Sequence, residues 1–590
     1  MAEYHNPQQE PGSERKLLLV LAVTFLVVTL SQTVFKKYLP QPPEPKPAAT
    51  QSQSGTANQN PPTSGAAVSG APAVGARTQA VASKQASSES ETVIENDLYR
   101  IVFTNRGGQV KSWVLKQYTD DKGNPLELVN ANAAQKHGYP LSLWSYDEGL
   151  RNKVNSVLYV AKSSGSRAPA QITFEYADAD VAVEKTYRFD HSYVVDVATS
   201  VRVKGSQATA FVMWPAGFGD QTGAAGFAAS QIAFQHDSKV ERLSSGWTLF
   251  PSIKIVNGNT IQGPFDWAAV GDQYFTSAFL PQDPENAALV TLREPLEIPH
   301  NPSDPSEKKT DKVDVYGIAV GNLKGSSAGR LFVGPKALPV LESVPVPGIS
   351  GASPDLRATV DFGWLGVIAR PLFMWLKWTY NHIVQNWGWA LVLQTVIINL
   401  ALLPLRIPQM KYSLKMMKLQ PQLKAIKDKY DKYSMRDPRK QEMQKEMWAL
   451  QQKEGLNPVT GCLPLFIQMP FLFAYYRMLA VAIDLRHASW LWIKDLSAPD
   501  PWHLLPIGII VTMLFMQRMT PQGGMDPAQQ KMMNIMMPGM LGIISWNLAA
   551  GLCLYWSMGN LIGIVQQTVM NRTTLGREMR ELMEKRAKKK

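Results

Sequence analysis

The uncharged run WALVLQTVIINLALLPL, residues 389–405, is the first of five apolar runs in the C-terminal half of the chain. The others are CLPLFIQMPFLFAYY (462–476, continuing through Arg477 to Ile483), LLPIGIIVTMLFM (504–516), MMNIMMPGMLGIISW (532–546) and GLCLYWSMGNLIGIVQQTVM (551–570). A helix needs about 20 mostly apolar residues to span a bilayer. Several runs are shorter, so we expect helices that thin the bilayer, bend or lean on their neighbours. The pattern predicts five membrane spans over residues 389–570.

The average composition conceals this domain. The chain has 590 residues, a net charge of +12 and a mean hydropathy of −0.15, which is typical of a soluble protein. All methionines except Met1 and Met213 lie at or after Met374, so a polar first half precedes an apolar second half. The two cysteines, Cys462 and Cys553, provide no disulfide framework.

The N-terminal 90 residues predict an anchor followed by a tether. Residues 17–35 form an uncharged run of 19 residues, preceded by Arg15 and Lys16. A cleaved signal peptide is the alternative, but no small-x-small cleavage site follows the run. We therefore expect a transmembrane anchor within residues 1–39. Residues 40–90 contain eight prolines and no aromatic residue, Leu or Ile, which predicts a flexible linker.

Residues 91–345 predict an antiparallel β-sandwich outside the membrane. Stretches such as QITFEYAD and VAVEKTYRFD alternate apolar and polar residues, and Arg106-Gly107-Gly108 marks a turn. A scaffold is one interpretation, and sugar or peptide binding through exposed tryptophans such as Trp113 or Trp247 is another. The four histidines of this region lack metal-ligand spacing, so we expect no metal site: His137, His191, His236 and His300.

Residues 346–388 predict a second linker and an amphipathic helix lying at the membrane surface. The run GWLGVIARPLFMWLKWTYNHIV (363–384) is interrupted by charged residues. Its apolar stripe contains Leu365, Ile368, Leu372, Trp375 and Thr379. A core helix of a soluble domain is the alternative.

Loop charges predict the orientation of the spans. Residues 406–460 contain 13 Lys or Arg against 6 Asp or Glu, and the tail 571–590 contains 8 against 3. Positive loops remain on the inner side of a membrane. Both termini and the 406–460 loop are therefore expected inside, and the β-sandwich outside.

The basic loop 406–460 predicts a helical hairpin. Met410, Leu414 and Met417 form one apolar stripe, interrupted by Pro421, and Asp437-Pro438 predicts the start of a second helix. A solvated loop is one interpretation. The other is a docking surface for anionic partners such as ribosomal RNA, lipid headgroups or acidic chains, formed by Lys411, Lys415, Lys418, Lys424, Met443 and Met447.

Polar residues follow one face in three of the predicted spans. Thr395 and Asn399 are four residues apart, and Arg406 lies seven further on, so the three share a helical face. By the same spacing, a second stripe contains Trp556, Asn560 and Gln567, and a third contains Gln468 and Tyr475. Facing one another, the stripes would form a hydrated cavity. Hydrogen bonding within a dry bundle explains them equally well, and a permeation path through a transporter or channel is a further alternative.

The chain resembles the YidC membrane-protein insertases in NWGWALVLQT (386–395), KLQPQLKAIKDKY (418–430), LNPVTGCLPLFIQMPFLFAYY (456–476), LWIKDLSAPDP (491–501) and GLCLYW…NLIGIVQQ (551–567). The resemblance runs from about residue 362 to the C-terminus, and the order of parts resembles the Gram-negative type with a periplasmic domain. It implies a non-enzymatic insertase and folding chaperone of the bacterial inner membrane. It also implies nascent membrane proteins, the Sec translocon, ribosomes and lipids as partners, and no cofactor.

The resemblance implies a hydrophilic groove that is open to the cytoplasm and lipid. Thr395, Gln468 and Trp556 match groove positions of the family, although the last is more often tyrosine. The family usually has a groove arginine on the second span, and Asn399 occupies the matching position here. Either Arg406 supplies the charge or the groove is neutral.

Overall fold

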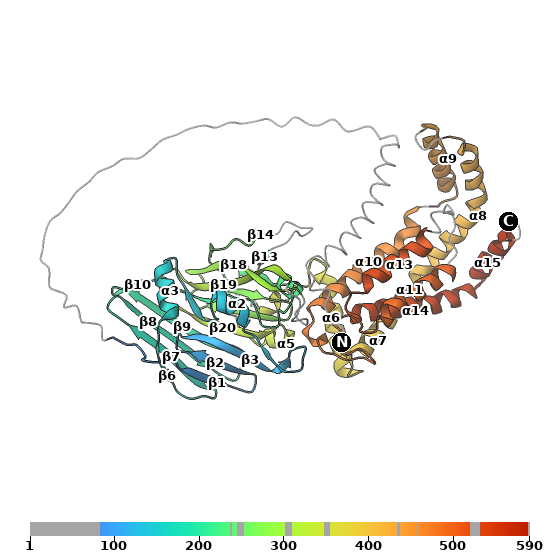
Figure 1. Cartoon of the computed structure of the whole chain (residues 1–590). Helices are drawn as coiled ribbons and strands as arrows, with labels where there is room; N and C mark the ends of the chain where they lie inside the picture. The colour runs from blue at the N-terminus through green and yellow to red at the C-terminus, as the bar shows by residue number, and fades with distance from the viewer. Residues whose placement is uncertain are drawn as a thin grey trace, which may run out of the picture. The chain divides into compact units, whose positions relative to one another are not determined.

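The computed structural model describes residues 83–236, 239–244, 253–300, 309–346, 355–433, 437–456, 458–519 and 532–587. The predicted anchor and most of the predicted linker lie outside the described residues. The end of that linker lies on the sandwich, because the Lys84 amide donates to the Ala177 carbonyl at 2.8 Å. Figure 1 shows strands in the first half of the described chain and helices in the second half.

Three sheets form the β-domain, and every strand pair is antiparallel except β13–β14. The first sheet has the order β1 (Glu91–Glu95), β2 (Tyr99–Thr104), β3 (Gln109–Thr119), β4 (Pro125–Glu127). The third has the order β15 (Asn259–Gln262), β18 (Ala287–Pro299), β19 (Thr310–Asn322), β11 (Phe211–Trp214), β5 (Ser142–Trp144). The predicted antiparallel β-sandwich is confirmed.

The second sheet is the largest. Its order is β14 (Ile253–Lys254), β13 (Lys239–Ser244), β12 (Gln231–His236), β16 (Trp267–Gly271), β17 (Phe275–Pro281), β20 (Ser327–Pro335), β9 (Val194–Val203), β8 (Val181–Phe189), β7 (Ala170–Ala177) and β6 (Val160–Ser163), with β10 (Ser206–Ala208) paired to β9. Short helices connect the strands: α2 (Ala131–His137), α3 (Glu148–Ser156), α4 (Ala224–Ala228) and α5 (Leu338–Glu342).

Local sequence explains the strands. Every second residue of β8 is buried, as the period of two requires for a strand with one face on the core. The β2–β3 turn uses Gly107 and Gly108, whose φ values of 67° and 54° favour glycine. Trp113 is fully buried and packs against Trp214, so the expectation that it is exposed for sugar binding is wrong. Trp247 lies outside the described residues.

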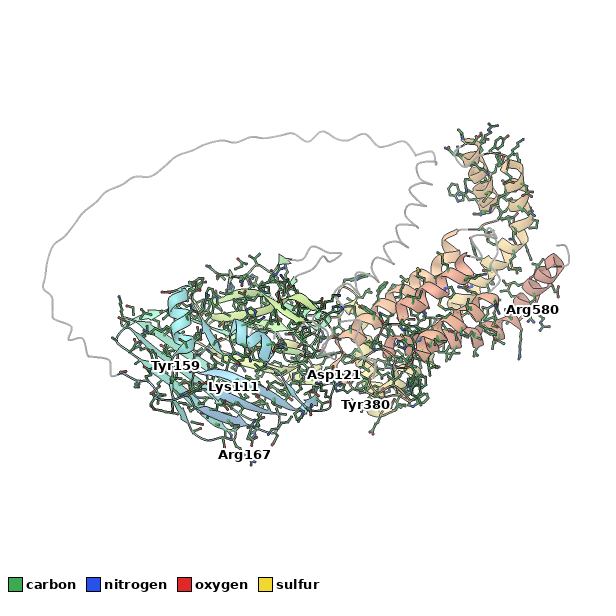
Figure 2. The ribbon with its side chains drawn as sticks, viewed as in Figure 1. Lys111, Asp121, Tyr159, Arg167, Tyr380 and Arg580 are labelled. Carbon is green, nitrogen blue, oxygen red and sulfur yellow. The ribbon has the colours of Figure 1, made fainter. Side chains whose placement is uncertain are left out.

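One charged side chain lies inside the sandwich. Lys185 on β8 is fully buried, and its Nζ donates to the carbonyls of Gly107, Gly108 and Leu141 at 2.7, 3.2 and 2.9 Å. The ring of Tyr159, labelled in Figure 2, lies 5.7 Å from the same nitrogen. Burial lowers the pKa of Lys185 to about 7, because an ammonium loses its hydration there. Lys185 thus ties β8 to the β2–β3 turn and to the residue before β5.

The second half of the chain is helical. After the 3-10 turn η1 (Leu356–Thr359) come α6 (Gly366–His382), α7 (Trp387–Ala401), η2 (Leu403–Leu405), α8 (Arg406–Tyr430), α9 (Arg439–Lys453), α10 (Pro458–Val481), η3 (Ile483–Leu485), α11 (Leu504–Met519), η4 (Met532–Met536), α13 (Met537–Ser545), α14 (Ala550–Asn571) and α15 (Thr574–Ala587). The five apolar runs thus coincide with α7, α10, α11, η4–α13 and α14.

Within the described part of the chain, no helix has both the length and the apolar character that a membrane crossing requires.

Helix α6 has two apolar faces. The predicted stripe faces the core, because Leu372 and Thr379 are buried and Ile368 and Trp375 pack against the core cluster. The opposite face exposes the large apolar side chains of Val367, Met374 and Trp378, and Trp364 is exposed just before the helix begins.

The hairpin of α8 and α9 matches the prediction in outline. Pro421 does not interrupt α8, and the second helix begins at Arg439, one residue after the predicted Pro438. Gly455, with φ of 65°, follows the end of α9, as a helix-terminating glycine does. The predicted basic tail also forms a helix, α15, which packs on α8.

Replacing Lys185 with Met tests the buried ammonium. The folded-state pKa of about 7 lies below the ordinary 10.5, so the unfolded state binds more protons between these pH values. The free energy of unfolding that Lys185 contributes therefore rises with pH in this window, by about 1.4 kcal/mol per pH unit. We expect the gap in Tm between wild type and Lys185→Met to widen from pH 7 to pH 9 in thermal unfolding of the full chain.

Lys162→Met is the matched control, because Lys162 is exposed and pairs only with Glu175 at the surface. Its Tm should stay close to that of wild type. A gap between wild type and Lys185→Met that does not change with pH would contradict the perturbed pKa.

Candidate functional site

Two predicted residues of α7 are buried in the helical bundle. The Thr395 hydroxyl donates to the Leu391 carbonyl at 2.7 Å, and the Asn399 Nδ2 donates to the Thr395 carbonyl at 2.9 Å. Each partner is the backbone one turn earlier, so α7 satisfies these donors itself. Thr395 and Asn399 of the predicted stripe are thus both buried on α7, and whether Arg406 shares their face stays a prediction.

Helix α14 supplies three amides to the same region, since α7 and α11 both pack against it. Gln566 Nε2 donates to the Asn399 backbone carbonyl at 3.0 Å. Asn560 Nδ2 donates to the Thr512 hydroxyl of α11 at 3.2 Å, and Gln567 Nε2 donates to Asn571 at 2.9 Å. All three amides are more than nine-tenths buried. Polar side chains thus connect α14 to α7 and to α11.

A tyrosine pair connects α10 to α14. The rings of Tyr475 and Tyr555 stack with centroids 4.0 Å apart and an interplanar angle of 14°. Both residues are buried, and the Tyr475 hydroxyl has no hydrogen-bond partner among the described residues. Trp556, the predicted residue of this region, is only half-buried. The stacked rings thus pack α10 against α14.

The remaining predicted groove residues lie elsewhere. Gln468 on α10 is exposed. Arg406 begins α8, but its side chain lies outside the described residues. The structure therefore buries Thr395 and Asn399 on α7 and Asn560 and Gln567 on α14, and it places Tyr475 in the separate tyrosine pair. Whether these residues line a groove stays a prediction.

Sequence reasoning missed four polar residues of the bundle, of which three are buried and Thr512 is half-buried. Gln394 is fully buried and donates to the Leu372 carbonyl of α6 at 3.0 Å, and Ser557 donates to the Leu505 carbonyl of α11 at 3.3 Å. Gln566 and Thr512 are the others. A signal was present, because each is an uncharged polar residue inside an apolar run. The predicted stripes did not include these residues. Gln394, Ser557 and Gln566 lie on other faces of their helices, and no stripe was predicted for the run that contains Thr512.

The predicted hairpin residues divide into two groups. Lys411, Lys415 and Lys424 are exposed, whereas Lys418 forms an ion pair with Glu578 of α15 at 2.6 Å. Met443 is buried, and Met447 packs against the cluster of Leu419, Leu423 and Leu456. Lys411, Lys415 and Lys424 are thus available to a partner, whereas Met447 packs α9 against α8.

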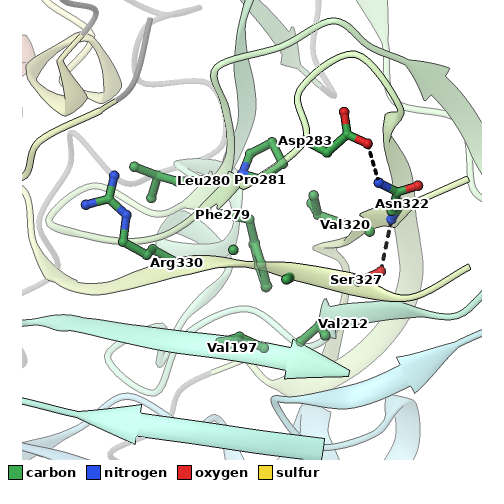
Figure 3. Close-up of a pocket in the computed structure, with 13 residues that line it drawn as sticks. Val197, Val212, Phe279, Leu280, Pro281, Asp283, Val320, Asn322, Ser327 and Arg330 are labelled. Carbon is green, nitrogen blue, oxygen red and sulfur yellow. Dashed lines mark hydrogen bonds between the residues drawn. The ribbon is translucent and has the colours of Figure 1, made fainter. Parts of the chain in front are cut away.

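The β-domain has a pocket between β17, β19 and β20 (Figure 3). Its lining includes Phe279, Val320 and Arg330, and Asn322 Nδ2 donates to Asp283 at 2.9 Å. The volume is about 40 Å³, far below the roughly 300–1,000 Å³ of typical ligand pockets. The pocket does not admit a sugar ring in this conformation.

Comparison with known proteins gives two family matches. Residues 91–375 match the family model described as the YidC periplasmic domain, and residues 378–577 match that of the 60Kd inner membrane protein. The membrane protein insertase YidC of Geobacter metallireducens is 30% identical over 94% of this chain and 98% of that protein. The chain belongs to the YidC family of membrane protein insertases. The family suggested by the sequence motifs is confirmed.

A second relative agrees with this assignment, and one solved structure is similar at a lower level. YidC of Dechloromonas aromatica is 31% identical over 95% of this chain and 97% of that protein. A solved structure of an active YidC insertase shares 18% identity, covers 83% of this chain and 95% of its own, and gives a TM-score of 0.34. The YidC family is one of membrane insertases and not a class of enzymes.

A double-mutant cycle tests the link between α11 and α14. Thr512→Val removes the acceptor of the Asn560 amide, and Asn560→Leu removes the donor. Interhelical hydrogen bonds of this kind contribute about 0.6 kcal/mol, and at most about 1.7. We expect a favourable coupling energy in that range from thermal unfolding in detergent. Thr568→Val with Asn560→Leu is the control pair, because the Thr568 hydroxyl bonds within its own helix. Additive effects in the first cycle would contradict the link.

Proposed function

We propose that this chain inserts nascent membrane proteins into the bacterial inner membrane, as the names of its relatives state for them. One observation carries the proposal beyond family membership: hydroxyl and amide side chains of α7 and α14 are buried inside helices that are otherwise apolar, and a bond from Gln566 joins the two helices. Such side chains are costly to bury in apolar surroundings, so their concentration in one place indicates a function.

The proposed core consists of α7, α10, η4–α13, α11 and α14 as five spans, with the N-terminal anchor as a sixth. The β-sandwich is proposed to lie in the periplasm, and both termini and the hairpin in the cytoplasm. The asymmetry of basic residues in the loops supports this orientation. Trp378 of α6 and Trp364, which precedes the helix, are both exposed, and this supports a position of the helix at the membrane interface.

The buried polar cluster supplies the proposed mechanism. A polar segment crossing a bilayer loses the hydrogen bonds that it makes with water, and this loss forms the main barrier to insertion. Amide and hydroxyl groups can replace part of that hydration without the large desolvation cost of a charge. The apolar segment of the substrate then partitions into lipid, which contributes about 25 cal/mol for each Å² of apolar surface buried.

The proposed groove works without a charge at the position of the family arginine. Asn399 is neutral, and the described partners of its side chain and backbone are Thr395 and Gln566. A neutral groove attracts its substrate through hydrogen bonds, so its activity should depend little on ionic strength. Arg406 is the alternative source of charge at the inner end of α7.

Ribosomes and the Sec translocon are proposed as partners at the cytoplasmic face. Lys411, Lys415 and Lys424 are exposed along α8, and Arg572, Arg577 and Arg580 are exposed near α15. A surface of this kind binds polyanions such as ribosomal RNA, with an affinity that falls as salt rises.

Insertion by purified protein in proteoliposomes tests the proposed function. Wild type should insert a small nascent membrane protein, and Asn399→Leu should lower the rate at least tenfold because it removes an amide from the cluster. Asn381→Leu makes the same replacement at an exposed position of α6 and should insert like wild type. Failure of Arg406→Ala alone would assign the groove charge to Arg406. Wild type that inserts no more than empty liposomes would refute independent insertase activity.

Ribosome binding tests the hairpin surface. Replacing Lys411, Lys415 and Lys424 together with Gln should weaken binding and lower the slope of log affinity against log salt by up to about three. The control replaces three exposed lysines of the β-domain, Lys122, Lys204 and Lys324, and should leave binding unchanged. Equal affinities in cosedimentation of both variants would argue against the hairpin as the docking site.

A further inference from the structure

Gln566 makes a hydrogen bond that neither the sequence motifs nor the family assignment explains. Its side chain on α14 is 6% exposed, and Nε2 donates to the backbone carbonyl of Asn399 on α7 at 3.0 Å. The bond joins two residues that are 167 positions apart in the sequence and lie on different helices. It therefore fixes the position of α7 relative to α14 at one level of the bundle.

The Asn399 carbonyl is available because α7 ends there. The helix ends at Ala401, and the 3-10 turn η2 with Pro404 follows. The last four carbonyls of a helix lack the usual partners from the next turn. Gln566 thus caps the last turn of α7 from a different helix.

The other end of the same amide faces no partner. Gln566 Oε1 is fully buried and accepts no hydrogen bond from the described residues. Gln394 on α7, five residues before Asn399, repeats this arrangement. Its Nε2 donates to the Leu372 carbonyl, and its Oε1 is buried without a described partner. Both amides donate to a neighbouring helix and keep an acceptor oxygen unused. An unused buried acceptor favours a ligand that brings an N–H or O–H donor.

We propose that Gln566 is a positioning residue of the insertion site: it holds the end of α7, and with it Asn399, against α14 while its oxygen accepts a donor from the incoming polar segment. The inference rests on the proposed insertase function and identifies donor-rich polar segments, with free backbone N–H or Lys and Arg side chains, as the class of substrate that this site accommodates. Gln566 positions Asn399 through its Nε2 and contacts the substrate through its Oε1, and it is distinct from Thr395, Gln468 and Trp556, the groove positions that the family resemblance suggests.

The experiment compares three variants in the proteoliposome insertion assay. Gln566→Met keeps the length of the side chain and removes both hydrogen-bonding groups, so we expect insertion at least tenfold slower than wild type. Gln566→Glu keeps the shape. Its protonated carboxyl can donate to the Asn399 carbonyl, but its carboxylate cannot. Gln422→Met makes the first replacement at an exposed position of α8 and should leave insertion unchanged.

The pH profile separates positioning from a general loss of structure. Rates are divided by the wild-type rate at each pH, which removes the effect of other titrating groups. The relative rate of Gln566→Glu should rise at least fivefold from pH 8 to pH 6, and that of Gln566→Met should stay constant. Insertion by Gln566→Met at the wild-type rate, or no pH recovery in Gln566→Glu, would overturn the proposal. Inactive wild type would refute the proposed function itself.

Discussion

The helical half of this protein depends on one requirement: every amide buried among apolar side chains needs a hydrogen-bond partner inside the bundle. Gln566 meets it at the Asn399 carbonyl, Asn560 at Thr512 and Gln394 at the Leu372 carbonyl. Each bond joins a different pair of helices, so together they determine how α14, α7, α11 and α6 are placed relative to one another. Apolar contacts alone are non-directional and would permit the helices to slide or rotate.

The β-sandwich meets the same requirement with a charged group. Lys185 has no carboxylate partner within hydrogen-bond distance among the described residues. Its Nζ donates hydrogen bonds to three backbone carbonyls instead. In both halves of the chain, a long side chain donates hydrogen bonds to backbone carbonyls of a distant segment, Lys185 in the β-domain and Gln566 in the helical half. The two groups differ in what they can bond. The ammonium of Lys185 can donate three hydrogen bonds and accept none, whereas the amide of Gln566 can donate to one helix and also accept from a ligand.

Local patterns predicted the elements well. Alternation predicted β7, β8 and β9, the glycine pair predicted the β2–β3 turn, and the apolar runs predicted the positions of the five helices. The four-residue spacing of Thr395 and Asn399 also identified a buried face of α7. These successes share a cause, because the period of a strand or helix is a property of a few neighbouring residues.

Contacts between distant segments were harder to predict. Gln566 lies beside the predicted Gln567, yet only the helix packing shows which of the two reaches α7. Met443 and Met447 were predicted as docking residues, and the structure buries the first and packs the second against Leu419 and Leu423 of α8. Trp113 was predicted as an exposed residue, whereas strand pairing turns it towards Trp214. In each case the decisive partner is far away in sequence, so periodicity holds no information about it.

The connection between α7 and α8 has a mechanical consequence. Helix α8 begins directly after η2, with 25 residues that extend about 38 Å from the end of α7. A tilt of only about 10° at this connection moves the far end of α8 by about 7 Å. A force on the far end of the hairpin is therefore transmitted through η2 to the last turn of α7. A large partner that pulls on the hairpin tip loads the last turn of α7, and the bond from Gln566 resists this load together with the packing of α10 and α15 on α8.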